Sequence, residues 1–482
     1  MFHLAIGGTH LFAQKRNCHL VPNVASIELK ELVSETLRHD FGELKRKLES
    51  KWSRDKTYEN DLISALRDLE SYKSFSMGLV EHEMCTEGTS VAVGYYANKL
   101  TNGVDRIRLE MNDPSAANRI TQIDVTRAFR FMDIPAHKLS VGRRLQMLDA
   151  YLHDLTKANV FAGTVLVAHQ GKTIYLKAFG KRYSGINENL NLEDPFDPVA
   201  FSKAFGEANS LTMKPISVND LFNLASLNKI VTAVAVFQLI ENGKLNLEDS
   251  MAKLLPDEVK SKEAGEIQLR NLLSHTSGIR FNLDQLSFKP GSKFSYNNMN
   301  FAYLGEIIER TSGMRYEDYV RIHIFAPMGM ASTARFGLKR MTDSIVIGDY
   351  EDIRDGQYVL TPNPYLQKYP GSAMGGFYST AGDLLKFAEG LRSGRLLRPE
   401  TVKLMRTPRT DLNAPEYGYG VMLWKGPGIW GHSGRLPGAD ADLEIFAETG
   451  YVAIVLSNKS EANPPVLSKI RSLFFPQSLN TK

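Results

Sequence analysis

The amino-acid sequence predicts an α+β protein with two folded parts, and three observations lead to this prediction. Residues 27–72 are charged and have helical periodicity, and strand-like stretches separated by turn-forming residues follow them. Strand-like stretches return at residues 163–180 and again after residue 419. Between them the chain is mostly helical, from Ser226 to about Pro408. We therefore expect a small α+β part, and then a domain whose antiparallel sheet comes from both of its ends and lies beside a helical subdomain.

The composition of the chain argues against several classes of protein. Its 482 residues suffice for two or three domains, and 43% apolar and 23% charged residues are ordinary for a globular protein. A net charge of +4, without a basic block interleaved with aromatic residues, indicates no nucleic-acid partner. Two cysteines, Cys18 and Cys85, are too few for a disulfide framework or a metal cluster, so we expect no metal. The longest apolar run, Ile230 to Ile240, is shorter than the roughly 20 residues that span a bilayer, so we expect no transmembrane segment.

The division of the chain follows its changes of pattern. Residues 1–26 are interpreted as a tail or a remnant signal: "LFAQ" could end a secretory signal, but no basic segment precedes it. Periplasmic or secreted and cytoplasmic locations therefore both stay open. Residues 27–135 are interpreted as a small α+β accessory domain with four strand-like stretches, "SFSMGLVEHEM", "TSVAVGYYANKL", "DRIRLEMND" and "RITQIDVTRAF". A linker is expected around Pro135.

Residues 143–482 are interpreted as the second domain. It begins with the helix "RRLQMLDAYLHDLTKANV" and a hairpin that turns at Gln170-Gly171. A polar stretch from Tyr183 to about Pro215 indicates a long loop. After the helical middle, strands are expected in "YGVMLWK", "GIWGHSG" and "ADLEIFAETGYVAIVLSN", and a final helix from about Pro464.

A serine and a lysine stand at the beginning of the most apolar helix. In "FNLASLNKIVTAVAVFQLIENG", residues 230–240 are almost purely apolar, which predicts a helix buried nearly all round. Ser226 and Lys229 are three residues apart on one helical face, so their side chains can touch. A serine hydroxyl needs a base to become a nucleophile, and an amine whose pKa is lowered by burial can be that base. The alternative is that Ser226 only caps the helix while Lys229 extends to solvent.

A tyrosine and an asparagine precede a second, amphipathic helix in "KPGSKFSYNNMNFAYLGEIIER". The hydroxyl of Tyr296 could relay a proton, and Asn298 could both donate and accept hydrogen bonds. The alternative is a packed tyrosine and a helix N-cap at Asn297 or Asn298.

A third polar motif occurs near the end of the chain, in "GIWGHSGRLPGADADLEIF". His432, Ser433 and Gly434 are expected at an exposed strand edge, which offers an N–H group to an oxyanion and can pair with an extended substrate. The alternative is a glycine-rich turn with a surface histidine.

These three motifs, in this order and spacing, resemble the serine β-lactamase and penicillin-binding-protein superfamily, in its branch of class C β-lactamase-like hydrolases and family VIII carboxylesterases. The resemblance extends over about residues 143–476 and includes "LLSHTSGI", "PGSKFSYNN", "APMGM" and "SAMGGFYSTAGDLLKFA". It implies a β-lactamase-like fold for the second domain, and a serine hydrolase that acts through an acyl-enzyme.

The resemblance also implies a role for each motif residue. Ser226 would be the nucleophile, Lys229 its base, and Tyr296 would share acid and base work with Lys229. Asn298 would bind the acyl side of the substrate. The backbone N–H groups of Ser226 and Arg435 would form the oxyanion hole.

The third motif departs from the pattern of most β-lactamases, because His432 takes the place of their lysine. A neutral imidazole is a poorer partner for the β-lactam carboxylate. H-x-G variants occur among DD-peptidases, D-aminopeptidases and esterase-like members, so His432, Ser433 and Gly434 would form a substrate-binding strand. His275 in "SHTSGI" is a tempting base, but it is set aside because the family uses this segment structurally.

The resemblance thus implies a carboxylesterase, or a peptidase or amidase acting on D-amino-acid derivatives, with no cofactor. The partner would be a small ester, amide or D-amino-acid peptide substrate. The alternatives are a β-lactamase of low efficiency and a non-catalytic penicillin-binding-like sensor or scaffold. No G-x-S-x-G elbow, P-loop or H-E-x-x-H is present in the sequence. The accessory domain is similar to the NTF2-like or cystatin-like domains of some relatives, and could cap the site, bind part of the substrate, mediate a homodimer or act as a spacer.

Overall fold

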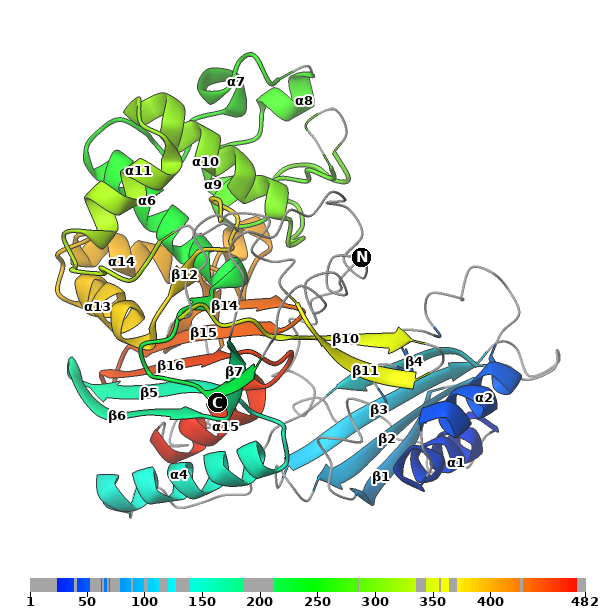
Figure 1. Ribbon diagram of the computed structural model, residues 1–482. Coiled ribbons are helices and arrows are strands. Elements are labelled where there is room, and N and C mark those ends of the chain that lie inside the picture. Colours follow the sequence, from blue (N-terminus) through cyan, green and yellow to red (C-terminus); the bar gives the residue numbers. More distant parts are fainter. Residues whose placement is uncertain are drawn as a thin grey trace. The chain divides into compact units, whose positions relative to one another are not determined.

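The computed structural model describes residues 24–38, 41–52, 62, 65–66, 69, 79–87, 90–98, 103–111, 120–126, 139–184, 212–259, 261–281, 283, 286–334, 344–354, 357–363, 371–424 and 428–474. Most of the predicted N-terminal tail and the predicted linker near Pro135 lie outside these residues. The fold is a mixture of helices and antiparallel sheets, as the sequence predicted (Figure 1). The chain forms two compact units, and each is described by itself.

The first unit contains a helix pair and a four-stranded antiparallel sheet. Its helices are α1 (Val24–Arg38) and α2 (Phe41–Lys51). The strands lie in chain order: β1 (Leu79–Glu87), β2 (Val91–Asn98), β3 (Gly103–Met111) and β4 (Ile120–Thr126). Along β3, Ile107 and Leu109 are buried whereas Arg108 and Glu110 are half-buried, the alternation of a sheet with one face on a core. Leu29 of α1 belongs to this core.

The same unit includes segments from later in the chain. They are α4 (Val141–Lys157), most of the hairpin of β10 (Asp349–Arg354) and β11 (Gln357–Pro362), and α15 (Asn463–Phe474). The side chain of Ser140 caps α4 by accepting the N–H of Arg143. The helices expected near residues 143–160 and after Pro464 are therefore present. The domain boundaries at 27–135 and 143–482, and the likeness to NTF2-like or cystatin-like domains, stay predictions.

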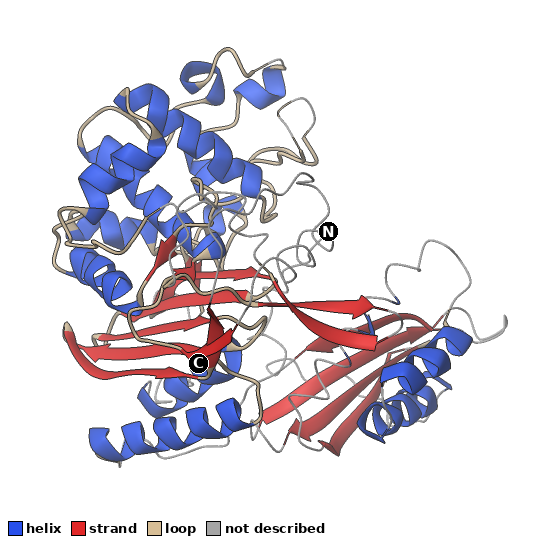
Figure 2. Ribbon diagram, in the orientation of Figure 1, coloured by secondary structure: helices blue, strands red, loops and turns tan. Residues whose placement is uncertain are grey.

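The second unit is built on a six-stranded antiparallel sheet in the order β13-β14-β15-β16-β5-β6. Figure 2 shows strands in red and helices in blue. Its strands are β5 (Gly163–His169), β6 (Lys172–Phe179), β13 (Met422–Leu423), β14 (Ile429–Leu436), β15 (Ala439–Phe446) and β16 (Tyr451–Ser457). The pairing of β16 with β5 joins strands from both ends of the domain, as predicted. The β5–β6 hairpin turns at Gln170 and Gly171, both with positive φ, as expected from the sequence.

Helices form the other half of the second unit. They are α6 (Lys229–Glu241), α7 (Met251–Leu254), α8 (Lys262–Gly265), α9 (Leu269–Leu273), α10 (Asn298–Ser312), α11 (Tyr316–Val320), α13 (Ala381–Arg392) and α14 (Pro399–Met405). Helix α6 is buried nearly all round, as its apolar sequence predicted. It shares one core with one face of the sheet, for example with Leu443 of β15 and Ile454 of β16.

Several short elements complete this unit. They are β7 (Lys181–Ser184), β8 (Thr212–Pro215), β9 (Phe222–Asn223), β12 (Tyr378–Ser379), the 3-10 turns η3 (Ala225–Asn228) and η6 (Thr410–Leu412), and the π-turn η4 (Arg321–Phe325). Strands β7 and β8 pair with each other, so the ends of the loop predicted from Tyr183 to Pro215 form a two-stranded ladder. Residues 185–211 of that loop lie outside the described residues.

Candidate active site

Ser226 lies in the tight turn η3, which immediately precedes α6. The sequence placed Ser226 in the first turn of the helix, but the regular helix begins only at Lys229. Ala225 has a φ of 45°, a conformation that residues other than glycine rarely adopt. The side chain of Asn223 accepts the N–H of Ala225 at 2.8 Å and helps to hold this conformation. Ser226 itself is half-buried, so its hydroxyl can meet a substrate.

Two glycines allow other parts of the backbone to approach this turn closely. A Cβ atom at Gly434 of β14 would lie 2.1 Å from the carbonyl oxygen of Leu224 and 2.6 Å from the nitrogen of Ser226. A Cβ atom at Gly375 would lie 2.5 Å from the carbonyl oxygen of Ala225. Any side chain at either position would therefore push the serine turn out of place.

Lys229 is completely buried beside Ser226. Its Nζ lies 2.9 Å from Ser226 Oγ and 2.5 Å from the carbonyl oxygen of Met374. The rings of Tyr296 and Phe301 also face the amine, with centroids at 5.2 and 5.7 Å. Among the described residues, no carboxylate forms an ion pair with it. Burial therefore lowers the pKa of Lys229 to about 7, so the amine is neutral for part of the time near neutral pH.

Tyr296 lies two residues before the start of α10, with its hydroxyl near that of Ser226. Its hydroxyl oxygen is buried beside the Ser226 hydroxyl and makes no hydrogen bond of ordinary geometry in the described part of the chain. Burial raises the pKa of the phenol, and the neighbouring Ser226 hydroxyl only partly opposes this rise. The phenol therefore stays protonated, which suits a group that donates a proton.

The segment after Tyr296 caps helix α10, as the alternative interpretation of the second motif predicted. The side chain of Asn297 is the N-cap and accepts the N–H of Met299 at 2.9 Å. Its amide nitrogen donates to the carbonyl oxygens of Ile279 and Arg280. Asn298 is exposed at the first position of the helix, so its amide is accessible to a ligand.

The expectation that the third motif lies at an exposed strand edge is wrong. His432 is 0% exposed and Ser433 is also buried, although the two-residue strand β13 pairs only with Trp430 and Gly431 of β14, before the motif. Its Nδ1 lies 2.6 Å from the carbonyl oxygen of Ser433, which can only accept, so the imidazole N–H donates there and Nε2 accepts from Tyr417 at 3.0 Å. Burial, with a contribution from Lys229, lowers the pKa of His432 to about 3, so the ring is neutral. The Ser433 hydroxyl is also buried and donates to the sulfur of Met422.

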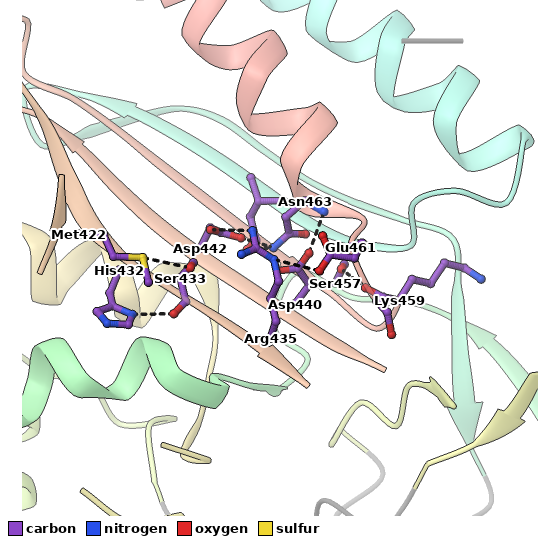
Figure 3. A network of polar contacts seen from close by, with 12 residues as sticks. Met422, His432, Ser433, Arg435, Asp440, Asp442, Ser457, Lys459, Glu461 and Asn463 are labelled. Atoms are coloured by element: carbon purple, nitrogen blue, oxygen red, sulfur yellow. Dashed lines mark hydrogen bonds and ion pairs between the residues drawn. The ribbon is translucent and has the colours of Figure 1, made fainter. Parts of the chain in front are cut away.

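The side chain of Arg435 is directed away from His432, to the other face of β14 (Figure 3). It lies directly opposite Asp440 of β15, with Nε 3.4 Å from the carboxylate, and it also approaches Asp442 and Glu461. Asp440 and Asp442 are both buried. Burial raises the pKa of Asp440, and the positive charge of Arg435 opposes this rise. The guanidinium therefore pairs with these carboxylates. Only the backbone of Arg435 continues along β14 past Gly434, beside the serine turn.

Sequence reasoning missed three contributors to this site and set a fourth, His275, aside. Tyr417, Met374, Gly375 and His275 all contact a motif residue or its turn, as their distances show. The Gly375-Gly376 pair was a usable signal, since paired glycines often mark a close approach of backbones. Nothing in the sequence singles out Tyr417 or Met374, because both contribute only through tertiary contacts.

These features define a serine hydrolase-type site on a mixed α+β fold: a serine hydrogen-bonded to a buried lysine, a tyrosine beside them, and a sheet strand against the serine turn. The Beta-lactamase family matches residues 148–474, and the chain belongs to this family. Penicillin-binding protein 4* of Bacillus subtilis is 28% identical over 356 residues, 65% of this chain and 72% of that protein.

Solved structures show the same fold. A penicillin-binding protein from Bacillus halodurans superimposes with a TM-score of 0.54 at 24% identity, over 67% of this chain and 99% of that one. A D-amino acid amidase from Ochrobactrum anthropi has a TM-score of 0.53 at 21% identity, over 69% of this chain and 99% of that one. At these identities the likeness concerns the fold alone.

The described residues show neither a metal-binding cluster nor a membrane-spanning helix. They contain no cluster of histidine, cysteine, aspartate and glutamate side chains arranged to hold a metal ion. No described helix has both the length and the apolar character needed to cross a bilayer.

Replacing the buried lysine should stabilise the protein while inactivating it. The pKa of Lys229 is about 7 in the folded state but near 10.5 in the unfolded chain, so the unfolded state binds more protons between these values. Lys229→Met removes this penalty, which is largest at and below pH 7 and disappears toward pH 10. The free energy of unfolding should rise at pH 7 by at most roughly 5 kcal/mol, at about 1.4 kcal/mol per pKa unit.

Denaturant unfolding at pH 6 to 10 measures this effect, with Lys403→Met on the exposed face of α14 as the control for loss of a surface amine. A Lys229→Met variant that is less stable than the parent at pH 7, or a difference independent of pH, would contradict the assignment of a neutralised buried amine.

Proposed function

We propose that this protein is a serine hydrolase that forms an acyl-enzyme on Ser226. The observation that carries the proposal is the completely buried amine of Lys229, 2.9 Å from the serine hydroxyl and with a pKa of about 7. When the amine is neutral, it accepts the Ser226 proton as Oγ attacks a carbonyl carbon. Its hydrogen bond to the carbonyl oxygen of Met374 fixes where Nζ lies.

Tyr296 completes the proton transfers in this proposal. The tetrahedral intermediate collapses when the leaving group receives a proton, and the buried, protonated phenol can donate it while Lys229 restores the phenol's proton. In deacylation the same pair takes a proton from the attacking water and returns one to Ser226 Oγ. The backbone N–H groups of Ser226 and Arg435 are proposed to bind the oxyanion, which the close approach at Gly434 supports. Asn298 is proposed to bind the acyl side of the substrate.

The proposed substrates are neutral esters or amides, including derivatives of D-amino acids. A lysine in the third motif would attract a substrate carboxylate, but His432 is neutral and both of its ring nitrogens already have partners. We therefore propose that His432 supports the conformation of the substrate-binding strand β14 and does not bind a substrate carboxylate. The side chain of Arg435 cannot replace the missing cation, because it pairs with Asp440 on the opposite face of the sheet. A β-lactamase of low efficiency and a non-catalytic sensor are the alternatives that the experiments below distinguish.

The first test concerns the nucleophile. A fluorophosphonate probe should label the parent protein once, and the modified peptide should contain Ser226, because only this serine has a base within hydrogen-bond distance in the proposed site. Ser226→Ala should abolish labelling and the hydrolysis of p-nitrophenyl butyrate, with an unchanged melting temperature. Ser457→Ala, a buried serine on β16, is the matched control and should label as the parent does. Labelling that survives in Ser226→Ala would refute the assignment.

The second test is the pH profile. Because neutral Lys229 is the active form, kcat/KM on a non-ionising ester should rise with pH through about 7 and level off above it. Tyr296→Phe should lower the plateau by about 10²-fold, the scale of a lost acid/base group, and should shift the rise because the two groups share a proton. Tyr319→Phe, a buried tyrosine in α11, is the control. A flat profile between pH 5 and 9 would show that Lys229 is not the base.

The third test ranks substrates. Since no cation of the third motif faces the proposed site, short-chain esters and D-amino-acid amides should have a kcat/KM at least about 10²-fold above that of nitrocefin, the scale of a lost charged hydrogen bond. Steady-state kinetics on all three substrates, with the Ser226→Ala variant as background, decides this. Nitrocefin turnover equal to ester turnover would favour the β-lactamase alternative.

A further inference from the structure

His275 holds the chain on both sides of Tyr296. Its backbone carbonyl accepts the N–H of Ser295 at 2.9 Å, and its Nδ1 accepts the N–H of Asn297 at 3.2 Å. Between these two hydrogen bonds, the imidazole packs on the Tyr296 ring, with centroids 4.2 Å apart and planes inclined by 34°. One completely buried residue thus contacts the proposed acid, the residue before it and the residue after it.

The hydrogen bonds fix the protonation state of His275. A backbone N–H can only donate, so Nδ1 must be an unprotonated acceptor toward Asn297, and the side-chain amide of Asn300 lies 3.0 Å from the same atom. The proton of the neutral ring is therefore on Nε2, which is buried and has no hydrogen-bond partner among the described residues. Burial, with contributions from Lys229 and His432, holds the pKa of His275 well below its usual range.

The backbone of His275 is also unusual. Its φ of 56° lies in the left-handed region, which costs free energy for any residue except glycine. The surroundings hold this conformation, since the rings of Phe294, Phe301 and Tyr417 enclose the imidazole. Packing alone does not explain this residue. Its backbone is strained, its Nδ1 is hydrogen-bonded, and its Nε2 has no hydrogen-bond partner among the described residues.

We propose that His275 is a positioning residue for the reaction: its neutral Nδ1 anchors the start of α10 and its ring supports the Tyr296 ring, so that the phenol stays beside Ser226. This inference rests on the proposed function. His275 moves no proton itself, because Nδ1 is occupied by Asn297 and Nε2 is enclosed. The Nδ1 acceptor is the decisive contact.

Two substitutions distinguish the effect of the Nδ1 acceptor from the effect of the imidazole ring. His275→Phe keeps an aromatic ring and loses only the hydrogen bonds of Nδ1, since Nε2 makes none. His275→Asn loses the ring but places an oxygen near the position of Nδ1 and tolerates a positive φ. The matched control is His169→Phe on β5, because His169 packs on Tyr451 in a similar way, with centroids 4.3 Å apart, and is not part of the proposed site.

The kinetic expectation is a loss in kcat and not in KM. His275→Phe should lower kcat for p-nitrophenyl butyrate by about 10-fold or more, with KM within twofold, whereas His275→Asn and His169→Phe should keep kcat within about fivefold. In a Tyr296→Phe background, His275→Phe should cause less than a twofold further loss, because it acts through Tyr296. A kcat equal to the parent's in His275→Phe, an equal loss in His275→Asn, or fully additive losses would overturn the proposal.

Amide hydrogen exchange tests the anchor without any assumption about activity. In His275→Phe the peptide covering residues 294–299 should exchange faster than in the parent at equal global stability, and in His275→Asn it should exchange as in the parent. Unchanged exchange in His275→Phe would overturn the proposal. Failure of the fluorophosphonate probe to label Ser226 in the parent would instead refute the proposed function, and the exchange measurement would still decide the role of His275.

Discussion

The site depends on one constraint, the complete burial of a lysine amine that has no carboxylate partner within the described residues. Such an amine is stable only if it loses its proton or if the surroundings accept its N–H groups. Here both conditions hold, because the Met374 carbonyl and Ser226 Oγ lie within hydrogen-bond distance and the pKa is about 7. The amine is 0% exposed, and the rings of Tyr296 and Phe301 face it. The burial that costs stability is thus the same feature that makes a neutral base available.

A second constraint is the close approach of backbones around the serine. The turn η3 can lie against β14 only because Gly434 has no side chain, and against the segment of Gly375 for the same reason. The antiparallel sheet made from both ends of the domain supplies β14. The C-terminal strands are therefore needed to complete a site whose proposed nucleophile, Ser226, lies more than 200 residues earlier. The positive φ of Ala225 is maintained by these contacts, in agreement with strain that concentrates at functional sites.

The sequence predicted those parts of the fold and site that depend on local pattern. The alternation of strands, the Gln170-Gly171 turn, the buried helix and the three-residue spacing of Ser226 and Lys229 are all readable from short segments. The sequence did not predict that His432 is buried, because this depends on tertiary contacts such as that with Tyr417, a partner 15 residues away. It also did not predict the positioning role proposed for His275, since the contacts with Ser295 and Asn297 arise only when two loops meet.

Three nitrogen bases are buried close together in this site, and their electrostatic coupling decides which one takes a proton. Charge on Lys229 lowers the pKa of both His275 and His432, and charge on His432 lowers that of His275. With pKa values of about 7 for Lys229 and about 3 for His432, the first proton enters on the lysine, and the positive charge then keeps both imidazoles neutral. The histidines are therefore fixed as hydrogen-bonding groups, and Lys229 alone changes charge near neutral pH. This division explains how a site with three potential bases can present a single titrating group to its serine.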